Sequence, residues 1–469
     1  MELKLTGRNF ELTNKRFYRK TVHLMLPVIL QQLITIGINF LDNIMVGSFG
    51  ETQISAVAFG NQFYSFFQFI CMGLGSGAIV MSAQFWGRRE LEPMRTVASI
   101  ALRLTTVLCA LFTVAGACFP QLVLRVFTDD PNIILVGTQY VRLVSLTFLP
   151  AGLASTATYL MRSIGKVEVP LIGSGVAFFL NLFFNWVFIF GKLGAPSLEL
   201  VGAAVGTLIA RLFEFCFVFG YFVFREDGFA FRIKHFLLSG RQLWGQYMKY
   251  SIPVLVSDTL LGLSLMLTVV IVGHIGEEIS AANAIVNSAS QVLTVVNTGM
   301  AGAASVVVGN TIGEGDIPRA KREGNTYVLI ALLFGVAIIP LLLLLEQPYI
   351  GLYNITPTTV AIAHGMVLCL CFMMPMQTIA YVTSKGILRG GGDTRFLLLA
   401  DSSMVWLVSL PLGALAGFVW HLAPVWVYFF LRIEYPLKGL ICLIRFLSGR
   451  WIKVIDAGKN SEQSAPVSG

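Results

Sequence analysis

The sequence predicts an all-α integral membrane protein in which twelve transmembrane helices form two homologous six-helix lobes. Apolar residues make up 56% of the 469 residues and charged residues only 12%, whereas a soluble protein needs roughly a quarter of its residues charged. Long apolar runs alternate with short polar loops, and at about 20 residues per span the chain has room for a dozen helices. The two halves also repeat one another, as is typical of secondary transporters.

The repeat relates residues 27–95 to a segment that begins 226 positions later. At this offset Pro27 aligns with Pro253, and Gly73 aligns with Gly299. Each half holds an even number of predicted helices, so both halves enter the membrane from the same side. We therefore expect a parallel repeat with its pseudo-twofold axis along the membrane normal.

Each predicted helix is an apolar run bounded by polar loops. The helices are expected near residues 20–47, 54–85, 96–120, 136–160, 168–190, 201–224, 248–273, 280–311, 323–346, 358–387, 396–418 and 423–446. The expected domains are an N-terminal lobe (1–224), a cytoplasmic linker (225–250), a C-terminal lobe (251–450) and a disordered tail (451–469). The linker is basic and amphipathic, so we expect it to lie along the inner membrane surface.

Basic residues predict the orientation, because Lys and Arg concentrate in cytoplasmic loops. They gather in the N-terminal segment, in the loops after helices 2, 4, 6, 8 and 10, and in the tail. The loops on the opposite side hold Arg125 and Lys192. We therefore expect a multi-pass protein of the plasma membrane with both termini in the cytoplasm.

Several classes of function are disfavoured by composition and spacing. The basic residues form no single face, which argues against nucleic-acid binding. The seven cysteines lie in apolar runs, as buried hydrophobic residues do, and the five histidines show no metal-ligand spacing. An intramembrane enzyme would need clustered His, Asp and Glu near one interface, and the sequence shows no such cluster. We expect no enzyme activity and no cofactor.

Four passages in order resemble the multidrug and toxic compound extrusion (MATE) family, in its NorM-like and DinF-like bacterial forms. They are Pro27 through Asp42 to Gly47, residues 181–207 with Asn181 and Asn185, the segment Gly386–Thr394, and residues 406–413. The likeness runs from about residue 18 to 450. The resemblance implies an ion-coupled exporter that alternates between inward-facing and outward-facing V shapes.

The first helix carries a charge where the membrane disfavours one. A charge near the bilayer centre costs on the order of 3 kcal/mol, and Asp42 is expected in the outer half of the membrane. Asn39 lies one turn earlier, while Asn181 and Asn185 share a face of helix 5 and Thr207 enters helix 6 at a similar depth. These residues could form a cation-binding group; alternatively, Asp42 is a hydrated carboxylate near a helix end.

The resemblance implies that Asp42 is the ion-coupling residue, because similar proteins carry an acid in helix 1. Asn185 stands where the archaeal type has a second acid, which leaves the choice between H⁺ and Na⁺ open. A carboxyl group removed from water binds a proton more readily. Alternatively, Na⁺ could use oxygens of Asp42, Asn181 and Thr207. No other metal is expected.

The C-terminal lobe contains a second set of intramembrane charges. Asp258, Lys385 and Asp401 are all expected in the inner half of the membrane. They could form a polar cluster that closes the cytoplasmic gate or binds substrate; alternatively, Lys385 extends to the interface and both acids lie near helix ends. The sodium-coupled branch of the family carries acids in helices 7 and 10. Here Asp258 is out of that register and Thr378 replaces the second acid, so its cation site does not transfer.

Candidate cavity residues come from several helices. Arg211 and Glu214 are three apart and are expected to pair on one helix face. If Glu214 faces the cavity, it joins Asn39, Tyr64 and Asp258 as a candidate site for cationic substrates. The helix 2 residues Phe63, Tyr64, Phe67 and Met72 could also line a cavity for flat aromatic cations.

The sequence thus predicts a cation-coupled antiporter that exports organic, cationic compounds across the bilayer as a functional monomer. The alternative is an exporter or flippase of a specific metabolite or lipid-linked substrate on the same fold. A lipid-linked substrate would require a strongly basic cavity, whereas the spans hold mostly acids and amides. A channel is disfavoured, because two repeats usually serve alternating access.

Overall fold

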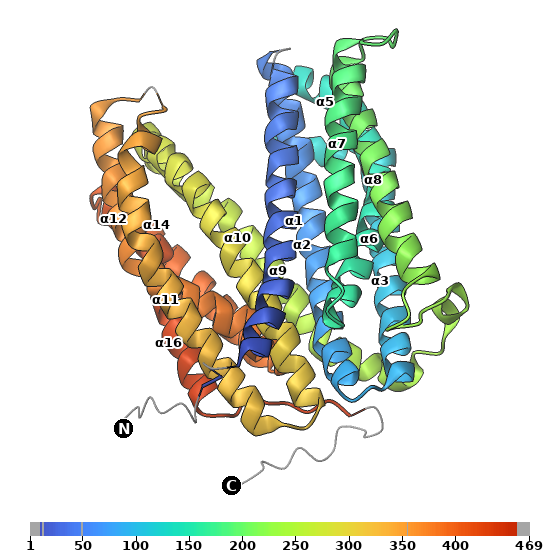
Figure 1. The fold of residues 1–469 in the computed structure, drawn as a ribbon. Coiled ribbons are helices and arrows are strands. Elements are labelled where there is room, and N and C mark those ends of the chain that lie inside the picture. The colour runs from blue at the N-terminus through green and yellow to red at the C-terminus, as the bar shows by residue number, and fades with distance from the viewer. Residues whose placement is uncertain (1–9, 12–13, 48–49, 354, 457–469) are drawn as a thin grey trace.

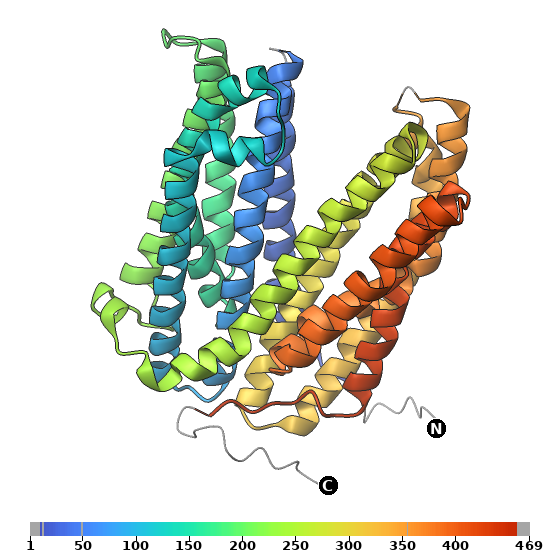
Figure 2. The same cartoon turned by 180° about the vertical axis from the view of Figure 1, so that it is seen from behind.

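The structure, a computed structural model, describes residues 10–11, 14–47, 50–353 and 355–456. These residues form helices and no strand. Two helical bundles meet on the side where the termini lie and diverge toward the opposite side (Figures 1 and 2). The shape is the V of two six-helix lobes.

The N-terminal lobe is built from the helices of the first half. They are α1 (Lys15–Gly47), α2 (Glu51–Gly87), α3 (Leu91–Cys118), α4 (Pro120–Arg125), α5 (Pro131–Ser145), α6 (Phe148–Ser163), α7 (Glu168–Phe190) and α8 (Glu199–Phe224). The predicted fourth helix is broken into α5 and α6, which meet at 45°. Pro150 lies in the first turn of α6 and has no N–H to continue the hydrogen bonds of α5.

The C-terminal lobe repeats this plan with more irregular helices. They are α9 (Arg241–Ile275), α10 (Glu277–Gly313), α11 (Ile317–Ile350), α12 (Pro357–Tyr381), α13 (Thr394–Ser402), α14 (Leu410–Ala414), α15 (Pro424–Arg432) and α16 (Glu434–Leu447). Three π-helical segments extend them: η2 (Val382–Leu388), η3 (Ser403–Ser409) and η4 (Leu415–Val419).

The span count agrees with twelve transmembrane helices. Ten helices of the described chain, counting α12–η2 and α13–η4 as one each, are long and apolar enough to cross a membrane. The bent pair α5–α6 is an eleventh. The helices α15 and α16, which meet at Ile433, occupy the place of the twelfth predicted span. The predicted fold class is confirmed.

The lobes touch through glycines near the point of the V. A Cβ at Gly77 of α2 would lie 2.2 Å from the Ser251 hydroxyl of α9. A Cβ at Gly73 would lie 2.6 Å from the backbone of Leu255. Small residues permit such close approach of membrane helices, so these positions hold the two lobes together on the terminus side.

The linker ends earlier than predicted, and the predicted disordered tail begins with an ordered segment. The linker contains the short helix η1 (Ile233–Leu237), and its last residues, from Arg241 on, already belong to α9. Residues 451–456 run across the terminus side of both lobes (Figure 2), with Trp451 and Ile455 buried. This course differs from the disordered tail expected from residue 451, because apolar side chains anchor the segment.

Hydrogen bonds attach this C-terminal segment to both lobes. The backbone N–H of Lys453 donates to the Gly391 carbonyl of the C-terminal lobe (2.8 Å). Gln84 at the end of α2 donates to the Lys453 carbonyl (3.0 Å) and accepts from the Ile455 N–H (3.0 Å). The segment 451–456 therefore connects the two lobes on the terminus side.

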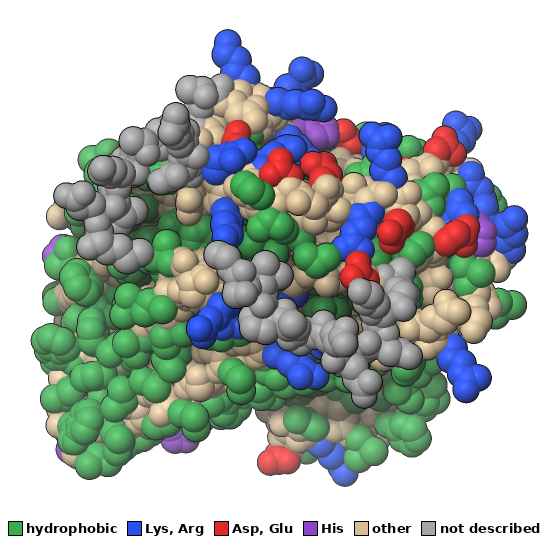
Figure 3. All heavy atoms as spheres, turned by 90° about the horizontal axis from the view of Figure 1, so that it is seen from below, with side chains coloured by type: hydrophobic (Ala, Val, Ile, Leu, Met, Phe, Trp, Pro, Cys, Tyr) green, Lys and Arg blue, Asp and Glu red, His purple; other side chains and the backbone are tan. Residues whose placement is uncertain are grey.

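The terminus-side face differs from the sides of the molecule. Figure 3 shows Lys and Arg side chains gathered on this face among acidic residues, with hydrophobic side chains prominent around it. Apolar flanks and a basic face are typical of a membrane protein seen from the cytoplasm.

Candidate functional site

The buried carboxylate of the N-terminal lobe lies in a hydrogen-bonded group from three helices. Asp42 on α1 is 7% exposed, and its Oδ1 accepts a hydrogen bond of 2.5 Å from the Asn185 amide. The same amide also donates to Asn181 Oδ1, one turn earlier on α7 (3.3 Å). Asn181 donates to the Thr207 hydroxyl on α8 (3.2 Å). The structure thus brings the four predicted cation-site residues together.

Close helix packing holds this group in place. Asn181 and Asn185 are four residues apart, so their side chains leave α7 on one face. Gly206 allows α8 to approach, since a Cβ there would lie 2.1 Å from Asn185 Oδ1. That oxygen is buried and accepts no hydrogen bond from the described residues. An unpaired acceptor beside a buried carboxylate favours the binding of a cation.

Asn39, one turn before Asp42, differs from this group in its exposure. It is exposed on α1, whereas Asp42 is buried. Three residues correspond to about 300° of helix rotation, so the two side chains are offset by about 60°. The offset is enough to separate an exposed position from a buried one on this helix.

A second polar group surrounds the predicted ion pair on α8. Arg211 Nη1 and Glu214 Oε2 are 2.7 Å apart, and both side chains are less than a fifth exposed. The Arg211 guanidinium lies 5.7 Å from the centre of the Tyr64 ring. The structure therefore places the candidate cavity residues Tyr64 and Glu214 together, with Arg211 next to both.

Hydrogen bonds continue from this pair through residues that the sequence did not single out. Ser174 on α7 donates to Glu214 Oε1 (2.7 Å) and accepts from the Gln31 amide on α1 (3.0 Å). Arg162, at the end of α6, donates to Gln31 Oε1 (3.3 Å). The signal that could have found them is the presence of polar side chains within apolar helices.

The helix 2 aromatics are mostly packing residues. Phe67 is fully buried and stacks on Phe148 with 4.6 Å between ring centres. Phe63 contacts Phe148 as well, at 5.4 Å. The prediction that Phe67 lines a cavity is therefore wrong, because α2 turns this face into the core of the N-terminal lobe.

The C-terminal lobe contains a buried charge cluster around Asp258. Lys385 Nζ lies 2.5 Å from Asp258 Oδ1, and Arg389 Nη2 lies 3.0 Å from the same oxygen. Lys385 is 8% exposed and Asp258 is fully buried. The alternative in which Lys385 extends to the interface is therefore wrong. Arg389, which the sequence analysis did not include, completes the cluster.

Asp401 has a different partner from the one predicted. Its Oδ1 lies 2.6 Å from Lys438 Nζ on α16, and its Oδ2 accepts a hydrogen bond from Ser257 (2.8 Å). Ser257 precedes Asp258, so the two carboxylates occupy adjacent parts of one buried region. Lys438 was missed although it is a charge within an apolar run, which is itself a signal.

The two lobes are chemically unequal at equivalent positions. The repeat aligns Asp42 with Thr268, whose hydroxyl donates to the Ser264 carbonyl of its own helix (2.9 Å). Thr378 likewise donates to the Met374 carbonyl (3.1 Å). The buried acid of the first lobe therefore has no counterpart at the aligned position of the second.

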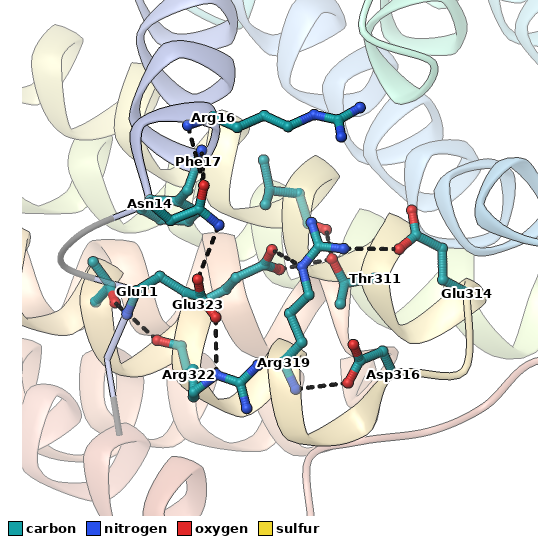
Figure 4. A network of polar contacts seen from close by, with 12 residues as sticks. Glu11, Asn14, Arg16, Phe17, Thr311, Glu314, Asp316, Arg319, Arg322 and Glu323 are labelled. Atoms are coloured by element: carbon teal, nitrogen blue, oxygen red, sulfur yellow. Dashed lines mark hydrogen bonds and ion pairs between the residues drawn. The ribbon is translucent and has the colours of Figure 1, made fainter. Parts of the chain in front are cut away.

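Polar contacts close the terminus side between α11 and the start of the N-terminal lobe, formed by Glu11 and by α1 (Figure 4). Arg322 Nε donates to Glu11 Oε1 (2.8 Å), and the Glu11 N–H donates to the Thr326 hydroxyl (2.9 Å). Deeper on the same helices, Thr21 and Tyr327 share a hydrogen bond of 2.8 Å. These contacts join the N-terminal lobe to the C-terminal lobe, so an inward-facing form must break them.

Burial alone would raise the pKa of Glu11, but hydrogen bonds from Arg322 and Asn14 lower it below its ordinary value. Because the pKa of Glu11 is lowered, the Glu11–Arg322 pair contributes its full stabilisation of the closed terminus side at every pH above the ordinary pKa of glutamate. This contribution is lost as pH falls through the lowered pKa. The contact is therefore expected to persist throughout the neutral range.

Glu11→Gln is expected to favour opening of the terminus side, because it removes one charge of an ion pair between the lobes. A partly exposed pair contributes on the order of 1 kcal/mol or less, so the population ratio should change up to about fivefold. Spin-label distances between the turn after α2 and the turn after α10 measure it. Glu92→Gln, which breaks the Arg95–Glu92 pair within one lobe, is the matched control. A change confined to acidic pH would contradict this account.

A family model described as MatE matches residues 27–187 and 253–431, one segment in each lobe. The chain belongs to the MatE family. Relatives within it carry multidrug-resistance names. "Probable multidrug resistance protein NorM" of Geobacillus kaustophilus is 25% identical over 413 residues, covering 84% of this chain and 87% of that protein. "Multidrug resistance protein MdtK" of Photorhabdus laumondii is 22% identical over 411 residues, covering 87% of this chain and 89% of that protein.

Solved MATE transporters share the fold. The crystal structure of the Vibrio cholerae MATE transporter VcmN matches with a TM-score of 0.84 at 15% identity, covering 92% of this chain and 97% of that one. An outward-facing multidrug resistance MATE family transporter matches with a TM-score of 0.83 at 18% identity, covering 92% of this chain and 95% of that one. The protein is a multi-pass membrane transporter with the MATE fold.

Proposed function

We propose that this MATE protein is a plasma-membrane antiporter that exports organic cations in exchange for H⁺ or Na⁺ by alternating access. The observation that carries the proposal is the buried Asp42, held by Asn185, Asn181 and Thr207 in one lobe only. A buried intramembrane acid marks an ion pathway by default. Both termini face the cytoplasm in this account, and one chain is the functional unit.

Coupling follows from charge neutralisation at Asp42. An ionised Asp42 accepts the Asn185 hydrogen bond, and it attracts a cationic substrate. A bound proton or Na⁺ removes that attraction, so substrate and coupling ion exclude each other. The unpaired Oδ1 of Asn185 offers a further oxygen ligand beside the carboxylate, and Na⁺ requires such oxygens while H⁺ does not.

Tyr64 and Glu214 are proposed to contribute to substrate binding. Glu214 is the acidic partner of Arg211 and lies within hydrogen-bond distance of Ser174. An aromatic ring and a carboxylate together suit an organic cation. Arg211 already neutralises Glu214, so a cationic substrate would have to compete with the Arg211 guanidinium for this carboxylate.

A second candidate function is the export of a metabolite or lipid-linked compound that carries an anionic group. The observation that favours it is the small number of carboxylates that contact three basic side chains, Arg162, Lys385 and Arg389. Arg162 donates to an amide rather than a carboxylate, and Lys385 and Arg389 share the single acid Asp258. An anionic substrate group could supply the missing negative charge.

Transport of a matched dye pair separates the two candidates. A rhodamine ethyl ester is a cation, whereas its free acid is a zwitterion of almost the same shape. Purified protein in liposomes is expected to move the ester at least several times faster than the acid. The ratio reports chiefly on charge, because the two dyes differ in shape only by the ethyl group of the ester. Faster movement of the acid would contradict the cation assignment and support the anionic substrate.

A further inference from the structure

A crevice on the outside of the molecule is unrelated to the transport site. It has a volume of about 340 Å³ and lies between α3 and the start of α9, lined by Arg103, Leu104, Val107, Gly240, Arg241 and Trp244. Gly240 brings the two segments together, because a Cβ there would lie 2.6 Å from Ile100. The crevice is therefore a fixed feature of how the linker joins the N-terminal lobe.

The basic end of the crevice has no acidic partner. Arg103 donates from Nη2 to the Leu238 carbonyl (2.8 Å) and from Nε to the Ser99 carbonyl (3.2 Å). These bonds fix the guanidinium but leave its charge uncompensated. Arg241 is exposed, and among the described residues neither arginine forms an ion pair with a carboxylate. Two guanidinium groups thus face one space without a counter-ion.

The other end of the crevice is apolar and continues along α3. Val107 is 60% exposed, and Leu111 and Val114 carry the same face further from the termini at 64% and 53%. Trp244 is 46% exposed at the mouth, and Trp residues are enriched where membranes meet water. The crevice is therefore amphipathic, with charge toward the termini and an apolar track away from them.

The neighbouring linker lies at the same membrane surface. Ile233 and Leu237 on η1 are 66% and 82% exposed, next to the basic Lys234. Exposed apolar side chains beside a lysine are typical of a segment that lies in the lipid headgroup region. Because the Arg103 guanidinium contacts this linker at the Leu238 carbonyl, we assign the two crevice arginines to the depth of lipid phosphates in the leaflet on the terminus side.

We propose that this crevice binds one anionic phospholipid of that leaflet. Its phosphate lies between Arg103 and Arg241, and one acyl chain follows Leu104, Val107 and Leu111. Arginine suits phosphate because its planar donors match the phosphate oxygens. Basic pockets between helices at this depth are suited to anionic headgroups. Free phosphate has no acyl chain to contact Leu104, Val107 and Leu111, so these residues favour a lipid over free phosphate.

The test measures lipid binding by the full-length protein in detergent. Short-chain phosphatidylglycerol is the anionic probe, short-chain phosphatidylcholine the zwitterionic one, and inorganic phosphate the headgroup without chains. Phosphatidylglycerol is expected to bind most tightly. Each arginine near the surface contributes about fivefold to such binding, so Arg103→Gln with Arg241→Gln should weaken it about thirtyfold. Arg450→Gln, an exposed arginine elsewhere on the same face, should change nothing.

Three results would overturn the proposal. They are equal binding of the two lipids, binding of inorganic phosphate as tight as that of phosphatidylglycerol, and unchanged binding in the double variant. Because Arg103 also supports the linker, the double variant could fail to fold. Arg241 is exposed, so Arg241→Gln alone should fold and still weaken phosphatidylglycerol binding about fivefold. Unchanged binding in that folded variant would equally overturn the assignment.

Discussion

Asp42→Asn is expected to reduce ion-gradient-driven efflux to the level of protein-free liposomes. The substitution keeps the size of the side chain and leaves an oxygen that can accept the Asn185 hydrogen bond. It removes the one group in the four-residue site that can be neutralised by a cation. Substrate binding and ion binding should therefore lose their mutual dependence. Efflux is measured as loss of a trapped fluorescent cation after a gradient is imposed.

Two variants make this result specific. Asp129→Asn changes an exposed acid in a loop and should leave efflux unchanged. Asp42→Glu retains the charge and should retain part of the coupled transport. If folded Asp42→Asn exported as fast as the wild-type protein, Asp42 would not be the coupling residue.

Asp258→Asn is expected to destabilise the C-terminal lobe by about 3–5 kcal/mol. The variant leaves Lys385 and Arg389 buried without the carboxylate that both contact. Removing only the carboxylate leaves buried cations without a partner, and this lowers the free energy of unfolding far more than replacing the whole ion pair with apolar side chains does. Thermal unfolding of the purified protein measures the loss, and Asp129→Asn is again the control.

A charge exchange tests whether the Lys385–Asp258 contact itself contributes to the stability of the C-terminal lobe. Asp258→Lys combined with Lys385→Asp restores one opposite-charge contact and should recover part of the stability lost in Asp258→Lys alone. Arg389 then faces a new lysine, so recovery should be incomplete. No recovery at all would mean that the Lys385–Asp258 contact contributes little to folding.

The sequence was sufficient to predict the spans and the convergence of four polar residues around Asp42; that they bind a cation stays a prediction. Hydropathy and the repeat located the helices, and the depth of each polar residue predicted that Asp42, Asn181, Asn185 and Thr207 would converge. Both arguments depend on the single fact that lipid disfavours polar groups unless they have partners. Each polar residue inside a span therefore indicates that another polar group lies next to it.

Partners near helix ends could not be predicted in this way. Arg389, which follows η2, could equally extend to water from the sequence alone, and only the folded structure shows that it contacts Asp258. Lys438 carried a signal as a charge within an apolar run, but the sequence did not identify Asp401 as its partner. Hydropathy did not predict the bend at Pro150, because a hydropathy value does not depend on whether a residue has a backbone N–H. The course of residues 451–456 was missed because this segment is too short to show a helical or strand pattern, although Trp451, Ile452, Val454 and Ile455 are apolar and Trp451 and Ile455 are buried.

The central claim is that an ion gradient drives export, and efflux from liposomes tests it most directly. Purified protein is reconstituted with a trapped fluorescent cation, and a pH gradient or a Na⁺ gradient is imposed separately. The account predicts that one gradient drives efflux and thereby identifies the coupling ion. No efflux with either gradient, from protein shown to be folded, would contradict it and favour the metabolite exporter or flippase.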